Sequence, residues 1–240
     1  MRYRLFATDI DGTLTPDRRS VNICLKAIQK LRELENTGIK VVLVSSNALP
    51  IVVGLRKYLG LTGPTIGETG ALIYFGGDRI VHLTDYTAEK ALDDVLDIFK
   101  DYVVSSWQNI FRLHDFALKI RDKYSDRSYE VFKSVKEYVE TKYDYIKTGF
   151  SGYAIHLTPI DVSKGKALKF IASELGIDRS EIVCVGDSVM DIDLIRECGL
   201  GVAVSNADEE LKEKADYVTS KPSCYGVIEL IDKIIRKSSF

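Results

Sequence analysis

Short apolar runs rich in β-branched residues alternate along much of this chain with amphipathic segments, and this alternation restricts the fold more than any other feature. Runs of this kind are typical of strands buried on both faces of a parallel sheet. Strands are predicted at residues 4–8, 40–44, 181–185, 201–204 and 215–219, and amphipathic helices at 21–34, 164–175 and 223–235. The pattern predicts an α/β fold, a Rossmann-like parallel sheet core with helices on both faces.

The middle of the chain has a different pattern. Residues 71–83 are predicted to form a hairpin around Gly76-Gly77. The elements predicted after it are a helix at 87–100, a strand near 112–121, a helix at 128–141 and strands at 143–147 and 152–157. Two helices among antiparallel strands indicate a small α+β domain at residues 83–156, inserted into a core built from residues 1–82 and 157–240.

The first predicted strand runs into Asp9-Ile10-Asp11-Gly12-Thr13. Residues two apart on an extended segment point the same way, so Asp9 and Asp11 can converge. Gly12 permits a tight turn in which backbone N–H groups approach an anion. Two carboxylates this close repel each other unless a cation or a shared proton intervenes, and Mg²⁺ prefers such oxygen ligands. A solvated Asp-Gly turn is the alternative for this short motif.

A second acidic pair follows a later predicted strand, in Gly186-Asp187-Ser188-Val189-Met190-Asp191. Asp191 lies about one helical turn after Asp187, so both can face one site. Ligands of open α/β sheets bind at the carboxyl ends of strands. Asp187 could instead cap the next helix, but a cap does not explain why two separate strand ends deliver carboxylates. We therefore predict a magnesium site formed by Asp9, Asp11, Asp187 and Asp191.

Two further segments suit a phosphate group. Ser45, Ser46 and Asn47 follow the strand at 40–44 and precede a helix, where hydroxyl and N–H donors can bind an anion. Lys164 stands at the start of a predicted helix, an end that the helix dipole makes unfavourable for cations, which suggests a local anionic partner. The alternatives are a serine helix cap and a solvated lysine, with Lys166 as a competing candidate.

Charge and composition exclude several classes of partner. Lys and Arg total 33 against 35 Asp and Glu, a formal charge of −2, and no basic cluster of the kind that binds nucleic acid is visible. No apolar window reaches the length of a transmembrane helix, and the apolar run at residues 5–7 is too short for a signal peptide. We therefore expect a cytoplasmic protein whose four cysteines are reduced thiols: Cys24, Cys184, Cys198 and Cys224.

In this order, the motifs resemble the haloacid dehalogenase superfamily of phosphohydrolases. The resemblance covers essentially the whole chain, and D-x-D-G-T combined with the later G-D-x-x-x-D is far more specific than either part. The inserted domain falls at the position of the family's type-two cap. The segments Gly67-Glu68-Thr69-Gly70-Ala71 and Gly152-Tyr153-Ala154-Ile155-His156-Leu157 are most similar to those of archaeal phosphoglycolate phosphatases.

The resemblance implies a role for each motif residue. Asp9 would be the nucleophile and a magnesium ligand, and Asp11 the general acid and base, with its backbone carbonyl on the metal. Asp187 and Asp191 would complete the magnesium site. Ser45 would bind the transferring phosphoryl group, and Lys164 would neutralise its charge. The implied cofactor is Mg²⁺, and the implied intermediate is an aspartyl phosphate.

The expected substrate is a small phosphorylated metabolite, with 2-phosphoglycolate as the leading hypothesis. A sugar-phosphate or mannosyl-3-phosphoglycerate phosphatase, a phosphomutase and a phosphate-binding module are the alternatives. The chain departs from the usual family pattern at Ser46, Thr69 and Met190. His156 is expected to be structural, and Trp107 to pack inside the inserted domain. The oligomeric state is open, with a homodimer as one option.

Overall fold

The computed structural model describes residues 3–20 and 22–236, and its larger lobe is built on an eight-stranded sheet. The strand order is β12-β11-β10-β1-β2-β3-β4-β5. Neighbouring strands are parallel from β12 to β3, whereas β4 and β5 extend the sheet as an antiparallel hairpin. The strands are β1 (Leu5–Asp9), β2 (Lys40–Val44), β3 (Thr65–Gly67), β4 (Leu72–Gly76), β5 (Arg79–His82), β10 (Ile182–Gly186), β11 (Leu200–Ala203) and β12 (Tyr217–Val218).

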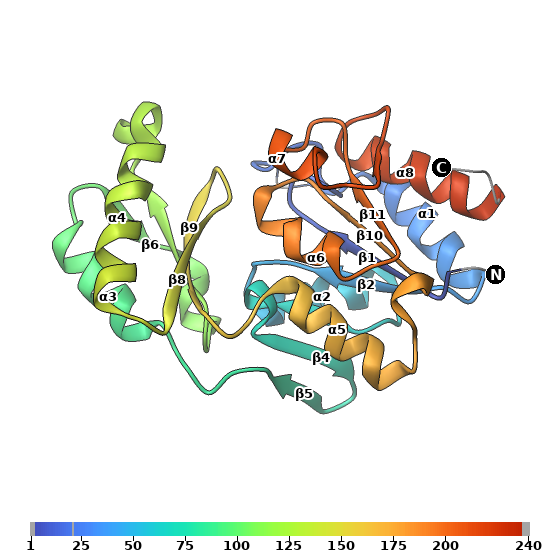
Figure 1. Ribbon diagram of the computed structural model, residues 1–240, viewed down its shortest axis with the longest axis horizontal. Coiled ribbons are helices and arrows are strands. Elements are labelled where there is room, and N and C mark those ends of the chain that lie inside the picture. The colour runs from blue at the N-terminus through green and yellow to red at the C-terminus, as the bar shows by residue number, and fades with distance from the viewer. Residues whose placement is uncertain (1–2, 21, 237–240) are drawn as a thin grey trace.

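Helices cover both faces of this sheet, which confirms the predicted α/β fold. α1 and α8 pack together on one face, and α5 and α6 pack together on the other (Figure 1). Because both faces are covered, every residue of β1 is buried. The helices of this lobe are α1 (Leu25–Asn36), α2 (Leu49–Leu59), α5 (Lys164–Leu175), α6 (Ile192–Arg196), α7 (Glu209–Lys212) and α8 (Ser223–Arg236).

The ends of α5 illustrate how local sequence sets the helix boundaries. The Ser163 hydroxyl accepts a hydrogen bond from the Lys166 N–H, and Gly176, with φ of 58°, ends the helix in the left-handed conformation. The predicted range 164–175 is therefore confirmed. The helix predicted at 21–34 instead begins at Leu25, and Val21 lies outside the described residues.

The smaller lobe has its own sheet, with strand order β6-β7-β9-β8, and all its neighbours are antiparallel. Figure 1 shows α3 and α4 on the side of this sheet that points away from the large lobe. Val131, Val135 and Val139 form the buried stripe of α4. The lobe comprises α3 (Glu89–Ile98), β6 (Val103–Ser105), β7 (Phe116–Ile120), α4 (Ser128–Lys142), β8 (Ile146–Phe150) and β9 (Ala154–Pro159).

The expectation of four reduced cysteines is wrong for two of them. Cys24 and Cys224 form a disulfide across a sequence separation of 200 residues, whereas Cys184 and Cys198 are free and buried. Spacing along the chain gave no sign of the bond, because the two cysteines meet only when α1 packs against α8. None of the helices in the described part of the chain combines the length and the apolar character that a membrane span requires.

Candidate active site

The two acidic motifs lie at the ends of adjacent parallel strands. Asp9 is the last residue of β1, and Asp187 directly follows β10. The register pairs Thr8 with Val185, which brings the two strand ends to the same edge of the sheet. Strand pairing therefore brings together two aspartates that are far apart in the sequence.

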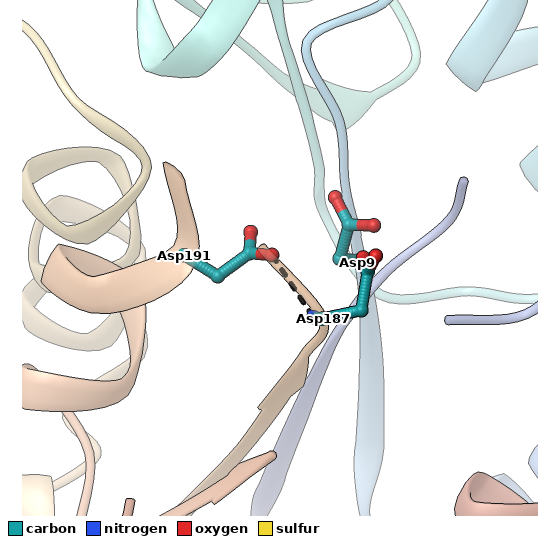
Figure 2. A group of neighbouring side chains, drawn as sticks. All are labelled: Asp9, Asp187 and Asp191. Atoms are coloured by element: carbon teal, nitrogen blue, oxygen red, sulfur yellow. Dashed lines mark hydrogen bonds between the residues drawn. The ribbon is translucent and has the colours of Figure 1, made fainter. Parts of the chain in front are cut away.

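Asp9, Asp187 and Asp191 form a buried cluster of carboxylates. Each offers one oxygen, and these oxygens all lie within 4.8 Å of one another. In Figure 2 the three side chains converge from β1, from the end of β10 and from the following turn. One oxygen of Asp191 accepts hydrogen bonds from the backbone N–H groups of Asp187 and Ser188, both at 3.1 Å, which fixes its orientation.

Lys164 bridges two members of this cluster. Its ammonium lies 2.6 Å from Asp9 Oδ1 and 2.6 Å from Asp191 Oδ1. Burial alone would lower the pKa of Lys164, but the two carboxylates outweigh burial and raise it. Lys166, the competing candidate, is exposed and donates instead to the Asp161 carbonyl. The structure thus brings Lys164, and not Lys166, into the site.

Arg18 is a second cation on the cluster, and the sequence analysis did not identify it. Its Nε donates to Asp187 Oδ2 at 2.5 Å, and its Nη2 lies 2.9 Å from Asp208 Oδ1. The Thr13 hydroxyl donates to the other oxygen of Asp187 at 3.1 Å. Gly12 allows this close packing, because its φ is 89° and a Cβ there would lie 2.4 Å from Asp187 Oδ2.

Asp11 lies outside the three-carboxylate cluster. Its Oδ2 accepts a hydrogen bond of 2.7 Å from Asn47 Nδ2, and Asn47 Oδ1 accepts one of 2.7 Å from Gln108 of the small lobe. Desolvation raises the pKa of Asp11, although the Asn47 hydrogen bond opposes the rise. A raised pKa favours the protonated form of the carboxyl group, which is the form that can act as a general acid.

A cavity of about 220 Å³ lies between the lobes and contains most of the predicted site. Asp9, Asp11, Lys164 and Asp187 line it, whereas Asp191 lies behind Lys164. The predicted phosphate-binding segment also lines it, with Ser45, Ser46 and Asn47. The cavity is smaller than the roughly 300–1,000 Å³ typical of drug-sized ligands, so it is suited to a small ligand.

The donor set fits a hard divalent cation. Every candidate ligand is a carboxylate oxygen, the type that Mg²⁺, Ca²⁺ and Mn²⁺ prefer. The three clustered carboxylates, at Asp9, Asp187 and Asp191, contact the ammonium of Lys164 and the guanidinium of Arg18. The cluster therefore keeps a net negative charge when all three are ionised, and a divalent cation would offset it.

Comparison with known proteins places the chain in a family. A family model described as haloacid dehalogenase-like hydrolase matches residues 6–142 and 109–231. A phosphoglycolate phosphatase from Staphylothermus marinus is 60% identical over 98% of both chains. One from Saccharolobus solfataricus is 37% identical over 97% of this chain and 96% of its own. The chain belongs to the haloacid dehalogenase-like hydrolases.

The fold comparison agrees with this membership. A crystal structure of a Thermoplasma acidophilum protein superposes with a TM-score of 0.83 at 24% identity, covering 98% of this chain and 99% of the other. At this identity the likeness concerns the fold alone. It extends over both lobes, so the arrangement of a large parallel sheet and a small antiparallel sheet is shared.

This hydrolase also contains a buried carboxylate at the lobe junction that the sequence analysis missed. Asp115 accepts hydrogen bonds from Arg112 at 2.5 Å, Thr158 at 2.5 Å and Thr69 at 3.0 Å, and one oxygen lies 3.1 Å from His156 Nδ1. Burial opposes its ionisation, but the neighbouring His156 and Arg112 lower the pKa of Asp115 below its usual range. Asp115 therefore stays charged and fixes its neighbours.

Glu68 strengthens the same junction. It is fully buried in the large lobe, and its carboxylate accepts the backbone N–H groups of Leu113, His114 and Asp115 in the small lobe. Glu68 and Thr69 both have positive φ angles, 49° and 55°, a backbone conformation that residues other than glycine rarely adopt. The Thr69 hydroxyl donates a hydrogen bond of 3.0 Å to Asp115 Oδ2 of the small lobe.

The expectation that Trp107 packs inside the small lobe is wrong, whereas the structural role expected for His156 agrees with its contacts. Trp107 does not pack inside the small lobe, because it is 60% exposed and lines the cavity. Its segment is a 3-10 helix without buried residues, so no apolar core is available to it. His156 is buried and bound to Asp115, as a structural residue would be, but it also lines the cavity.

The pKa of Asp187 leads to a prediction for the metal-free hydrolase. Burial and the neighbouring Asp191 raise this pKa from 3.8 to about 6, against the opposing charge of Arg18. Between these two values the unfolded chain releases a proton that the folded chain retains. Stability should therefore fall by on the order of 3 kcal/mol as the pH rises from about 4 to about 6.

Urea unfolding in a chelator at a series of pH values measures this effect. Asp187→Asn should lack this part of the pH dependence, because asparagine does not titrate, and Arg18 keeps its contact with Asp208. Parallel stability profiles for the wild-type and variant proteins would contradict the assignment.

Proposed function

We propose that this hydrolase is a magnesium-dependent phosphatase that converts 2-phosphoglycolate to glycolate and phosphate. The main support for this chemistry is that Asp9 and Asp11 both line the cavity and that the ammonium of Lys164 contacts Asp9, the proposed nucleophile. The substrate assignment is supported by the relative from Staphylothermus marinus, which is 60% identical along almost its whole length.

In the proposed mechanism, a carboxylate oxygen of Asp9 attacks phosphorus and the bond to the glycolate oxygen breaks. Asp11 donates its proton to the departing glycolate oxygen. Water then attacks the phosphoryl group on Asp9 and transfers a proton to Asp11, which releases phosphate and restores both carboxyl groups. The raised pKa of Asp11 supports the acid role, because the group must carry a proton when the substrate binds.

The remaining residues would bind and orient the phosphoryl group. Ser45 lines the cavity at the end of β2 and can donate its hydroxyl proton to a phosphoryl oxygen, while Lys164 supplies positive charge beside Asp9. Asp9, Asp187, Asp191 and the backbone carbonyl of Asp11 would hold Mg²⁺. When bound, the ion would neutralise charge on the phosphoryl oxygens.

We further propose that the small lobe, expected at residues 83–156 and extended by β9 to Pro159, acts as a cap over this site. Its residues Gln108 and Arg112 contact Asn47 and Ser46 of the large lobe, which closes one side of the cavity. A closed cavity excludes bulk water from the covalent intermediate until the product leaves. The small volume of the cavity supports a small substrate.

A panel of phosphate esters in the presence of Mg²⁺ tests the substrate assignment. We expect the highest kcat/KM for 2-phosphoglycolate, compared with sugar phosphates and mannosyl-3-phosphoglycerate. Equal or faster hydrolysis of a sugar phosphate would refute the assignment. Hydrolysis in ¹⁸O-labelled water should place label in the released phosphate, whereas a phosphomutase would release no labelled phosphate.

A cytoplasmic location and a homodimer remain predictions from the sequence. Gel filtration of the purified chain would test whether it forms a homodimer.

A further inference from the structure

One face of the small-lobe sheet forms a wall of the cavity. Side chains alternate between the two faces of a strand, and the cavity-lining residues of this sheet follow that alternation. They are Ala117 and Lys119 of β7, and Ala154 and His156 of β9. The intervening residues, Leu118 and Ile155, belong to the apolar core on the other face. The strands therefore hold Lys119 on the cavity side.

Small side chains surround Lys119 on this wall. The register pairs Lys119 with Ala154 and Ala117 with His156. Two alanines leave space where larger side chains would fill the wall, and that space lies directly beside the lysine. The ammonium of Lys119 lies 5.1 Å from the centroid of the Tyr153 ring, which can hold the charge over the cavity through a cation–π contact.

The other buried or half-buried cations of the cavity already have carboxylate partners. Lys164 contacts Asp9, Arg18 contacts Asp187, and Arg112 contacts Asp115. Within residues 3–20 and 22–236, no carboxylate lies within ion-pair distance of Lys119. Lys119 is half-buried, faces the cavity and has no anionic partner in the described chain. Its ammonium is therefore available to bind an anionic group of the ligand.

We propose that Lys119 binds the carboxylate of the substrate and thereby selects phosphate esters that carry an acid group. This inference rests on the proposed function, because the phosphoryl group would occupy the Asp9 end of the cavity. A two-carbon acid phosphate has its second anionic group at the far end from the phosphate. Lys119 belongs to the small lobe and Asp9 to the large lobe, so the two ends of such a substrate would be bound by different lobes.

The substrate carboxylate does not change during the reaction, so its contact with Lys119 contributes mainly to binding. Such a contact affects KM more than kcat. Removing a charge-assisted hydrogen bond should lower kcat/KM by roughly 10- to 100-fold. This loss should disappear for a substrate that lacks the carboxylate.

The experiment compares 2-phosphoglycolate with 2-hydroxyethyl phosphate, in which a neutral hydroxyl replaces the acid group. Lys119→Met and Lys119→Gln keep the side-chain bulk and remove the charge. Both should lower kcat/KM for 2-phosphoglycolate by roughly 10- to 100-fold, chiefly through KM, and change it by less than about 3-fold for 2-hydroxyethyl phosphate. Lys119→Arg should recover part of the loss.

Lys123→Met is the matched control. Lys123 also lies over a tyrosine ring, 4.9 Å from the centroid of Tyr124, but it is exposed and does not line the cavity. This variant should behave as wild type with both substrates. An equal loss on both substrates in Lys119→Met, or no loss on either, would overturn the proposal.

Arg19 is the competing candidate for binding the substrate carboxylate. It lines the cavity from an exposed loop, and no ion pair holds its guanidinium within the described chain. If Arg19→Gln, and not Lys119→Met, removed the preference for the acid substrate, Lys119 would not be the residue that recognises the carboxylate. If the wild-type enzyme itself showed no preference for 2-phosphoglycolate over 2-hydroxyethyl phosphate, the proposed substrate would fail before any variant was compared.

Discussion

Asp9→Asn is expected to lower the turnover of 2-phosphoglycolate by about 10⁴-fold or more, because an amide oxygen is too weak a nucleophile to attack phosphorus. The fold should remain intact. Burial raises the pKa of Asp9 well above its ordinary value, against the attraction of Lys164, and Asp191 and Asp187 add to the rise. A charged Asp9 therefore costs stability in the metal-free protein, and a neutral side chain removes that cost.

Steady-state kinetics and thermal unfolding should be measured together on this variant. Acid quenching during turnover should trap a phosphoenzyme in the wild-type protein and none in Asp9→Asn. Asp101→Asn is a suitable control, because Asp101 is exposed and does not line the cavity. Near-normal turnover by a correctly folded Asp9→Asn protein would exclude Asp9 as the nucleophile.

Removal of divalent cations is expected to abolish measurable turnover, and added Mg²⁺ should restore it. The physical reason is the excess negative charge that remains after Lys164 and Arg18 have each contacted the cluster. Without a balancing cation, the site would repel the phosphate dianion, which carries further negative charge. Activity assays with a chelator, followed by titration with Mg²⁺, measure this directly.

A binding measurement separates the metal site from catalysis. Mg²⁺ should raise the Tm of the wild-type protein, because a ligand that binds only the folded state stabilises it. The increase should be smaller in Asp187→Asn, which loses one ligand oxygen of the buried cluster. Full activity in the presence of chelator would be incompatible with the proposed cofactor.

The sequence predicted the parts of the site that depend on strand ends. Asp9, Asp187 and the serine segment each directly follow an apolar run, and parallel strands deliver their carboxyl ends to one edge. Lys164 was also predictable, because the helix dipole disfavours a lysine at the start of a helix unless an anionic group lies nearby. In these cases a local pattern and a general rule of sheet geometry were sufficient.

The residues that were missed depend on contacts that no local pattern encodes. Arg18 reaches Asp187 across a separation of 169 residues, from a loop that resembles any solvated basic segment. Asp115 acquires its partners from both lobes, and Cys24 meets Cys224 only through helix packing. Such contacts follow from how the lobes and helices pack in three dimensions, and a single sequence does not record that packing.

The position of β1 between β2 and β10 has a consequence for biosynthesis. The ribosome makes β1, which carries the proposed nucleophile Asp9, long before it makes β10, and β2 soon supplies one neighbour. The other neighbour, with Asp187 and Asp191, is not made until more than 170 residues later. A nascent chain that has not reached β10 holds Asp9 beside an open strand edge, so the proposed active site cannot form until β10, Asp187 and Asp191 have been made.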